Sequence, residues 1–241
     1  MKKIKFTALN DRALKLDPQP TPASTNAPSW YKKTPKYDSF EGGSQSLIDF
    51  AKSQNYHTTF KMCQPFTDGL VSGYTLSLPA TVVVVQALTP DGDFSPKIRW
   101  NTDWNIADIQ HPLVATQLPK PEGYSPDVFR WINNWKIETP SGYSCLVMHP
   151  IHRYDLPFHT LTGIVDTDKN PNPLLLPFFI KKDFEGEIPL GTPIAQVIPF
   201  KRDAWESETS KEVLDPHGPM RVKQTFQRAY KQFYWSKKSF K

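Results

Sequence analysis

The chain has 241 residues, which is enough to bury a sizeable core in one large β domain or in two smaller ones. It contains 24 prolines and 11 glycines, and this excludes long helices over most of its length, because proline lacks a backbone donor and fixes φ. The net charge of +5 is uneven: residues 218–241 hold seven Lys and Arg and no acid, so the rest is close to neutral. That balance does not favour a nucleic-acid-binding core.

The cysteine content and the N-terminus predict a cytoplasmic protein. Two cysteines, Cys63 and Cys145, are too few for a disulfide framework and indicate reduced thiols. The first residues, MKKIKFTAL, are basic but lack the apolar run of a secretory signal. No stretch approaches the ~20 apolar residues of a membrane helix, so we expect no membrane partner.

The first hundred residues predict short strands around an irregular arm. Alternating apolar residues predict a strand over residues 2–9. Residues 16–43, rich in Pro, Ser, Thr and Asn, predict an extended arm fixed to the surface by Trp30, Tyr31 and Tyr37. Residues 46–54 fit a short helix. Strands are predicted over 56–62, 70–78, 81–88 and 97–100, and the β-branched run TVVVVQAL makes 81–88 a buried central strand.

The rest of the chain has the all-β pattern of short strands separated by turn signals. Residues 101–126 predict a loop with a helical turn at 106–109, and the aromatic alternation of residues 129–138 predicts one strand. Residues 139–142, with Pro140 at the second position and Gly142 at the fourth, predict a type I turn. Further strands are predicted over 143–148, 159–165, 174–181, 184–188 and 193–200.

These elements predict a mostly β single domain over residues 1–241. An N-terminal strand and arm occupy residues 1–45, a β core occupies residues 46–203, and a basic amphipathic tail occupies residues 204–241.

Residues 138–200 resemble the core of the dUTPase and dCTP-deaminase superfamily. Residues 140–147, PSGYSCLV, are similar to the strand that leads into the family's phosphate-binding motif. Residues 163–168, GIVDTD, are similar to its G-x-I-D-x-x-Y motif, and residues 190–198, LGTPIAQVI, to its G-x-x-I-A-Q-L-I strand. The resemblance implies a distorted jelly-roll or β-clip barrel and a homotrimer.

The whole chain also resembles an uncharacterised family found in phage and bacterial genomes. The segments that carry this resemblance are W-Y-K-K, D-L-P-F and G-T-P-I-A-Q-V-I-P-F-K-R. It implies no known activity.

The dUTPase resemblance implies a nucleotide site. Asp166 falls on the aspartate that orients the attacking water or the sugar hydroxyl, and with Asp168 it forms the predicted catalytic pair. Arg153, with His149 beside it, is predicted to bind phosphate through its fork of donors. Gln196 matches the glutamine that helps to hold the neighbouring subunit's site, and Mg²⁺ would bridge the phosphates. Our first hypothesis is therefore a phage-type nucleotide-binding protein related to nucleotide pyrophosphohydrolases or deaminases.

The sequence also departs from the family pattern. These departures leave open a non-enzymatic hypothesis, which is the third beside nucleotide binding and the metal site described next. Residues 149–154, HPIHRY, stand where the family has P-R-S-G, and a basic aromatic tail replaces the glycine-rich C-terminal arm. A fold can be inherited without its reaction. The chain would then be a structural or anti-defence interaction protein.

A second hypothesis comes from the histidine cluster. His149, His152, Asp155 and His159 lie within eleven residues and predict an Fe²⁺ or Zn²⁺ site of a metal-dependent enzyme. In the alternative interpretation, Asp155 pairs with Arg153 or caps a turn, and the histidines lie at the surface or support other residues. A polar ligand site without a metal is the third alternative.

Two further patterns leave alternatives open. Asp166 and Asp168 are two residues apart at a strand end and point the same way, so they either bind a cation, raise one carboxyl pKa or are simply solvated. In the tail, Val222, Phe226, Tyr230 and Phe233 have helical spacing. That helix would dock on the core or on a neighbouring subunit, or it would cover an anionic ligand such as a nucleotide or a nucleic-acid backbone.

Overall fold

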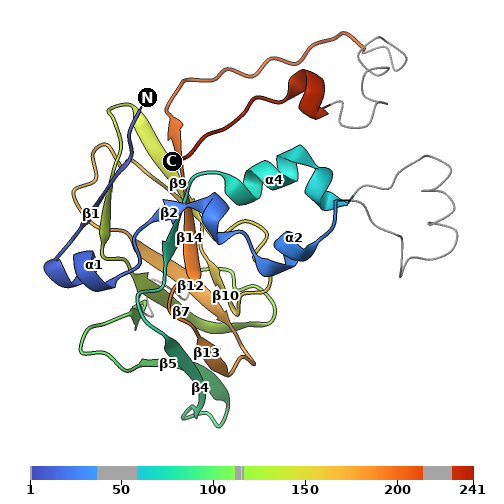
Figure 1. Cartoon of the computed structure of the whole chain (residues 1–241). Helices are drawn as coiled ribbons and strands as arrows, with labels where there is room; N and C mark the ends of the chain where they lie inside the picture. Colours follow the sequence, from blue (N-terminus) through green and yellow to red (C-terminus); the bar gives the residue numbers. More distant parts are fainter. Residues whose placement is uncertain (1, 37–58, 112–114, 116, 214–229) are drawn as a thin grey trace, which may run out of the picture. The chain divides into compact units, whose positions relative to one another are not determined.

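The computed structural model describes residues 2–36, 59–111, 115, 117–213 and 230–241 (Figure 1). They belong to two compact units. We call Met1–Asn26 with Gly73–Arg202 the β unit, and Ala27–Ser72 with Asp203–Lys241 the aromatic unit. The border after Arg202 lies close to the predicted start of the tail, and a single domain over both units stays a prediction.

The β unit confirms the predicted mostly β class. Its described residues include two short helical elements with both ends placed, α1 (Asp11–Leu16) and the 3₁₀ turn η1 (Ala23–Asn26). Its strands are β1 (Lys5–Ala8), β2 (Thr21–Pro22), β3 (Tyr74–Ser77), β4 (Val82–Leu88), β5 (Phe94–Trp100), β6 (Ala107–Ile109), β7 (Tyr124–Ile132), β8 (Trp135–Glu138), β9 (Tyr143–Met148), β10 (Phe158–Thr160), β11 (Gly163–Val165), β12 (Leu175–Lys181), β13 (Gly186–Ile188) and β14 (Pro193–Lys201).

These strands form four antiparallel sheets. The largest has the order β11-β9-β14-β3-β2, and the second has the order β10-β12-β7-β6. A three-stranded sheet, β13-β4-β5, contains the hairpin at the bottom of Figure 1, and β1 pairs with β8. Within the described residues the strands form open sheets and no closed barrel.

A continuous hydrophobic core joins the sheets. Trp131 of β7 is fully buried and stacks on Phe178 of β12, with ring centroids 3.8 Å apart, and Phe158 of β10 contacts both rings edge-on. Val82 and Val84 of β4 and Val197 of β14 are also fully buried in this core. Aromatic rings of this size bury the most apolar area per residue, so this stack is a main source of the unit's stability.

The prediction of one strand over residues 129–138 is wrong, because two asparagines interrupt it. The Asn133 side chain accepts a hydrogen bond from the Trp135 amide (3.1 Å) and donates to the Trp135 carbonyl (2.6 Å). The Asn134 side chain donates to Asp17 at 2.9 Å. Asparagine side chains that bind nearby backbone compete with a strand ladder in this way. The chain therefore leaves β7 and begins β8, which pairs with β1.

Three other predictions in the β unit need correction. Residues 106–109 are not a helical turn, because β6 pairs with residues 129–131 of β7. Residues 159–165 are not one strand, because β10 and β11 belong to different sheets. The strand β4 is central in its sheet, as predicted, but only alternate residues are buried. Its β-branched run therefore has one face in the core rather than two.

The regular structure described in the aromatic unit is helical. It contains α2 (Ser29–Lys33), the 3₁₀ turn η2 (Phe60–Met62), α4 (Gln64–Val71) and the π-helical turn η3 (Tyr230–Tyr234). Among the described residues, α4 alone is a helix of seven or more residues. Trp30 and Tyr31 pack on Phe66, which confirms their predicted anchoring role.

Several predictions for the N-terminal third are wrong or fall outside the described residues. Where a strand was predicted over residues 56–62, Phe60–Met62 form a 3₁₀ turn. The strand predicted over residues 70–78 is shorter, because residues 70–71 end a helix and β3 is Tyr74–Ser77. Pro65 at the helix start supplies the fixed φ that suits a first turn. The predicted arm over residues 16–43 contains short helical turns rather than only extended chain. Tyr37, the helix over residues 46–54 and most of the tail helix lie outside the described residues.

In the part of the chain that the structure describes, no helix has the length and apolarity needed to cross a bilayer.

Gly73 is required where the chain enters β3. Its φ is +73°, and a Cβ built there would lie 2.1 Å from the Val197 carbonyl oxygen of β14. Gly123 has a similar φ of +79° but open space around it.

We expect Gly73→Ala to destabilise the protein far more than Gly123→Ala. The second substitution adds only left-handed backbone strain, about 1–2 kcal/mol, whereas the first adds a clash with a strand of the main sheet. Thermal and urea unfolding of both variants measure the difference. Equal losses of stability would contradict the close approach of Gly73 to β14.

Candidate functional site

The three segments that resemble the dUTPase motifs lie side by side in the largest sheet. Strand β9 lies between β11 and β14, so Cys145 faces Val165 on one side and Pro199 on the other. The turn before β9 closes through the Tyr143 amide, which donates to the Pro140 carbonyl at 3.2 Å, with Gly142 at φ +82°. A turn is present here, as predicted, but it spans residues 140–143 rather than 139–142, and the positive φ at its third residue, Gly142, is typical of type II rather than of the predicted type I.

Arg202, at the end of β14, binds both predicted catalytic aspartates. Its guanidinium makes a two-pronged ion pair with Asp168, one arm of which measures 2.8 Å, and it donates to Asp166 at 3.1 Å. Asp166 also accepts a 2.6 Å hydrogen bond from Ser144. The Asp168 side chain is only 3% exposed, and the amide of Gly142 donates to it at 2.9 Å. We call these residues the carboxylate clamp.

The carboxylate clamp holds both aspartates in the ionised form. The hydrogen bond from Arg202 lowers the pKa of Asp168 to about 2. The hydrogen bond from Ser144, followed by the charge of Arg202, lowers the pKa of Asp166. Of the alternatives for Asp166 and Asp168, the raised carboxyl pKa is therefore wrong. The cation that binds the two carboxylates is a side chain of the same chain, Arg202. A carboxylate with so low a pKa is a poor general base near neutral pH.

A loop after β9 contains most of the other predicted site residues. Gln196 of β14 is buried and accepts a 2.9 Å hydrogen bond from the Ile151 amide, so it supports the loop of its own chain. His149 accepts from the Thr160 amide through Nδ1 (3.2 Å), and its Nε2 is 3.1 Å from the Arg153 carbonyl. Because Nδ1 is an acceptor, Nε2 carries the proton and donates.

This loop is conformationally restrained at two further points. His152 has φ +59°, a left-handed conformation uncommon in residues other than glycine. His149 and His159 stack with ring centroids 4.5 Å apart. Burial lowers the pKa of His149 to about 4 and also lowers the pKa of His159. Both stacked rings are thus neutral near pH 7.

Arg153 lines a polar hollow of about 400 Å³. Its side chain is 13% exposed and makes a bidentate ion pair with Asp155, with two N–O distances of 2.9 Å. Lys181, Glu187 and the apolar side chains of Phe184 and Ile188 also line this hollow. We call it the Arg153 hollow.

The four predicted metal ligands do not form a ligand set. Both ring nitrogens of His149 already have backbone partners, and Asp155 is bound to Arg153. Over the described ranges, no three His, Cys, Asp or Glu side chains come together in a way that could hold a metal ion. These residues therefore do not fit Fe²⁺ or Zn²⁺, and the alternative pairing of Asp155 with Arg153 is confirmed.

The Arg153 hollow and the carboxylate clamp lie at opposite ends of β9. Ser144, which binds Asp166, is the second residue of this strand, and His149 follows its last residue. Five residues of extended chain span roughly 16 Å. An arginine that holds a phosphate and a group that orients its attacking water must act within a few ångströms of one another. Arg153 and Asp166 of one chain therefore do not serve one phosphorus atom.

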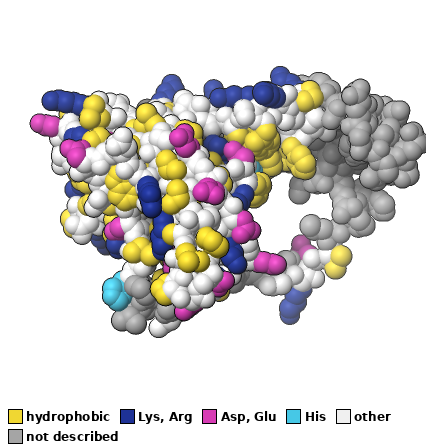
Figure 2. Space-filling view, turned by 90° about the horizontal axis from the view of Figure 1, so that it is seen from below, with side chains coloured by type: hydrophobic (Ala, Val, Ile, Leu, Met, Phe, Trp, Pro, Cys, Tyr) yellow, Lys and Arg dark blue, Asp and Glu magenta, His cyan; other side chains and the backbone are white. Residues whose placement is uncertain are grey.

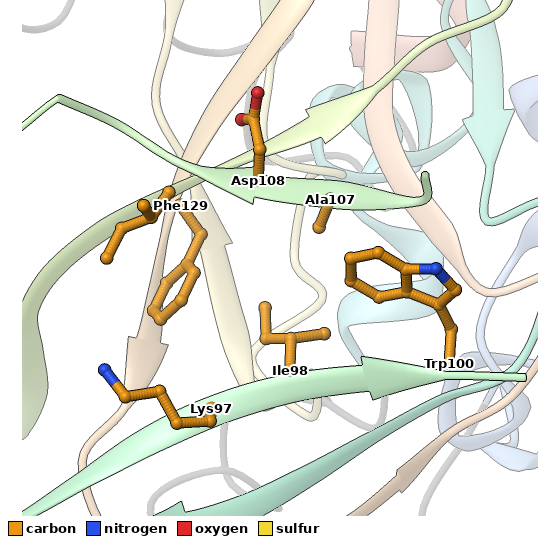
Figure 3. Close-up of a pocket in the computed structure, with 7 residues that line it drawn as sticks. Lys97, Ile98, Trp100, Ala107, Asp108 and Phe129 are labelled. Carbon is orange, nitrogen blue, oxygen red and sulfur yellow. The ribbon is translucent and has the colours of Figure 1, made fainter. Parts of the chain in front are cut away.

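A second hollow, of about 300 Å³, was not predicted from the sequence (Figure 3). Ile98 and Trp100 of β5 face Ala107 of β6 and Phe129 of β7 across it, and Lys97 lies at its edge. Its walls are mainly apolar and offer little that would bind phosphate. The alternation of Ile98 and Trp100 along β5 indicates that this strand has an apolar face. The strands across the hollow, β6 and β7, belong to another sheet and could not be predicted from that local pattern.

Charges are mixed on one face of the molecule. On the face seen in Figure 2, acidic and basic side chains are interspersed over the described atoms. On this face, an anionic ligand would thus be bound by particular groups rather than by a broad positive field.

No known protein family matches the chain, and no curated protein matches it.

We expect Arg202→Met to lower the unfolding midpoint much more than Arg99→Met. The first substitution leaves two adjacent carboxylates without their counter-charge, whereas Arg99 is an exposed residue of β5. Thermal unfolding near neutral pH measures both. If the two variants lose the same stability, the carboxylate clamp does not hold the ends of β9, β11 and β14 together.

The neutral state of His149 predicts a pH dependence of stability. Its pKa is about 4 in the folded protein against an ordinary value of 6.5, so the unfolded chain takes up the proton first as the pH falls. The contribution is fully present above pH 6.5 and is lost towards pH 4, on the order of 3 kcal/mol at most. In His149→Gln, whose amide can both donate and accept, this part of the pH dependence disappears. Unfolding at pH 4 to 7 tests this, and an unchanged slope would contradict it.

Proposed function

We propose that the chain is a nucleotide-binding protein with a dUTPase-like β-clip fold, and that the Arg153 hollow holds the phosphates. The fold proposal is supported by the adjacency of β9, β11 and β14, which carry the three motif segments in one sheet. The nucleotide pool it would use is that of the bacterial or phage-infected cytoplasm.

The ion pair between Arg153 and Asp155 is the observation that carries this function. Arginine binds carboxylate and phosphate through the same planar, bidentate geometry. Asp155 thus occupies the place that a phosphate would take. Its side chain is 45% exposed, so it can move into solvent when a ligand arrives, whereas Arg153 is mostly buried and stays in place. Lys181 adds a second positive charge in the same hollow.

Mg²⁺ fits this arrangement as a companion of the phosphates. It is usually bound by one or two carboxylates together with phosphate oxygens. Asp155, once displaced from Arg153, and Glu187 are the carboxylates that line the hollow and would hold it. The ion would neutralise the charge of those phosphate oxygens that Arg153 and Lys181 do not contact.

Hydrolysis of the bound nucleotide would need an assembly. The roughly 16 Å between the two ends of β9 separates Arg153 from Asp166 in one chain. A second copy of the chain would have to bring its aspartate to the hollow, as in the homotrimer that the resemblance implies. Binding by a single chain is therefore the core of the proposal, and pyrophosphohydrolase or deaminase activity is an extension of it.

Nucleotide binding is tested by thermal shift and equilibrium titration with dUTP, dCTP and ATP, each with and without Mg²⁺. Ligand at a hundredfold excess over Kd should stabilise the wild type by about 2.7 kcal/mol. Arg153→Ala should lose at least about tenfold in affinity, since one charged hydrogen-bonding partner contributes about 1.5–3 kcal/mol. Asp155→Asn should bind more tightly than the wild type without Mg²⁺, because it removes the competing carboxylate.

Asp166→Asn is the matched control, since it changes an aspartate at the other end of β9. It should bind nucleotide as the wild type does. An equal shift in Arg153→Ala and the wild type would refute the site. If no nucleotide shifts the wild type, the nucleotide proposal fails and the non-enzymatic interaction protein becomes the better hypothesis.

A further inference from the structure

The aromatic unit combines many lysines with exposed aromatic rings. Described residues 27–36, 59–72 and 230–241 contain eight lysines, and Asp68 is their one acid. Asp68 is itself paired: Lys238 lies 2.6 Å from it, and the Trp235 indole donates to it at 2.8 Å. These contacts also join the C-terminal segment to α4. The helices and the C-terminal segment thus form one lysine-rich surface.

Large rings on this surface are open to solvent. Phe60 is 73% exposed, Phe233 is 55% exposed and Trp30 is 38% exposed. Phe60 and Trp30 both lean on Phe66, so they are held by packing while part of each ring faces water. Held rings with an exposed face lose little conformational entropy when another flat group stacks on them.

Lysines lie close to two further rings of the unit, which are partly buried. Lys61 is 5.4 Å from the centre of the Tyr31 ring, and Lys231 is 5.7 Å from that of Trp235. A ligand with alternating negative charges and flat faces would match this alternation of cations and rings. The segment 203–213 of the same unit carries four acids, so it is not a part of this surface.

We propose that the aromatic unit binds single-stranded nucleic acid, with lysines on the phosphates and bases stacked on the exposed rings. Unpaired bases expose the faces that stacking needs, whereas a duplex hides them. A basic aromatic surface also suits an anionic membrane, and the test separates the two. The proposal is independent of the Arg153 hollow, which lies in the β unit.

The primary experiment is fluorescence anisotropy with a fluorescein-labelled oligothymidylate of about 20 nucleotides, longer than the ~4–16 nucleotides of common single-strand sites. The oligonucleotide should bind more tightly than the same strand in a duplex. Its affinity should fall with salt, with a slope of about −0.7 for each phosphate contacted. Vesicles of phosphatidylcholine and phosphatidylserine serve as the competing probe. Binding to the vesicles but not to the oligonucleotide would overturn the proposal.

Matched charge variants locate the surface. Lys33→Glu with Lys237→Glu should weaken oligonucleotide binding at least about tenfold and reduce the salt slope. Lys3→Glu with Lys120→Glu makes the same change of net charge on exposed residues of the β unit and should have a much smaller effect. Equal losses in the two double variants would overturn the location.

A matched aromatic pair tests stacking. Phe60→Ala should weaken binding at least about fivefold, in the range found for a single stacked base. Phe94→Ala removes a ring that is 62% exposed in the β unit and should leave binding unchanged. Phe60→Ala should keep the wild-type affinity for nucleotides, because Phe60 does not line the Arg153 hollow, so failure of the nucleotide site and failure of this one are distinguishable. Equal affinities of Phe60→Ala and the wild type for the oligonucleotide would exclude stacking at this ring.

Discussion

The ion pair between Arg202 and Asp168 is the interaction on which the β unit's main sheet depends. Arg202 directly follows β14 and Asp168 lies just beyond β11. The Arg202 guanidinium also donates to Tyr143 and Ser144 at the start of β9. One side chain thus joins three neighbouring strands at the same end. A carboxylate that is almost fully covered is costly unless it is paired, so the arginine and the aspartate require each other.

The main sheet places the second group of predicted site residues at the opposite end of β9. Gln196 and His149 hold the loop after β9 through backbone hydrogen bonds, and this fixes the Arg153 guanidinium at the hollow. The residues that the sequence singled out for chemistry thus divide into two sets. One set, around Arg202, stabilises strand ends. The other contains the guanidinium of Arg153, which is paired with the half-exposed side chain of Asp155.

The sequence predicted most of the strands of the core and part of the site. Strand β9 and the strands near β12, β13 and β14 follow from alternation and turn residues, which are local signals. The division of residues 129–138 does not, because it depends on Asn133 binding the backbone of Trp135. Residues 159–165 were wrongly predicted to form one strand for a related reason. Their two halves pair with strands distant in the sequence, and a local pattern does not name those partners.

Site predictions failed where the deciding partner was remote. The pairing of Asp155 with Arg153 was among the open alternatives, since the two residues are close in sequence. Arg202 was missed because it lies 34 residues from Asp168 in the sequence. It is the last residue of the segment P-F-K-R, which was noted only for a family resemblance. The buried state of His149 also needed the fold. Its spacing to His152 and His159 suggested a metal, whereas burial and two backbone partners make it a structural group.

The length of β9 has a kinetic consequence. If the Arg153 hollow of one molecule needs the aspartate of another for turnover, the working unit exists only while copies are associated. The rate per molecule would then fall on dilution below the dissociation constant of the assembly, while nucleotide affinity would persist. A strand of six residues would in this way tie the protein's activity to its own concentration.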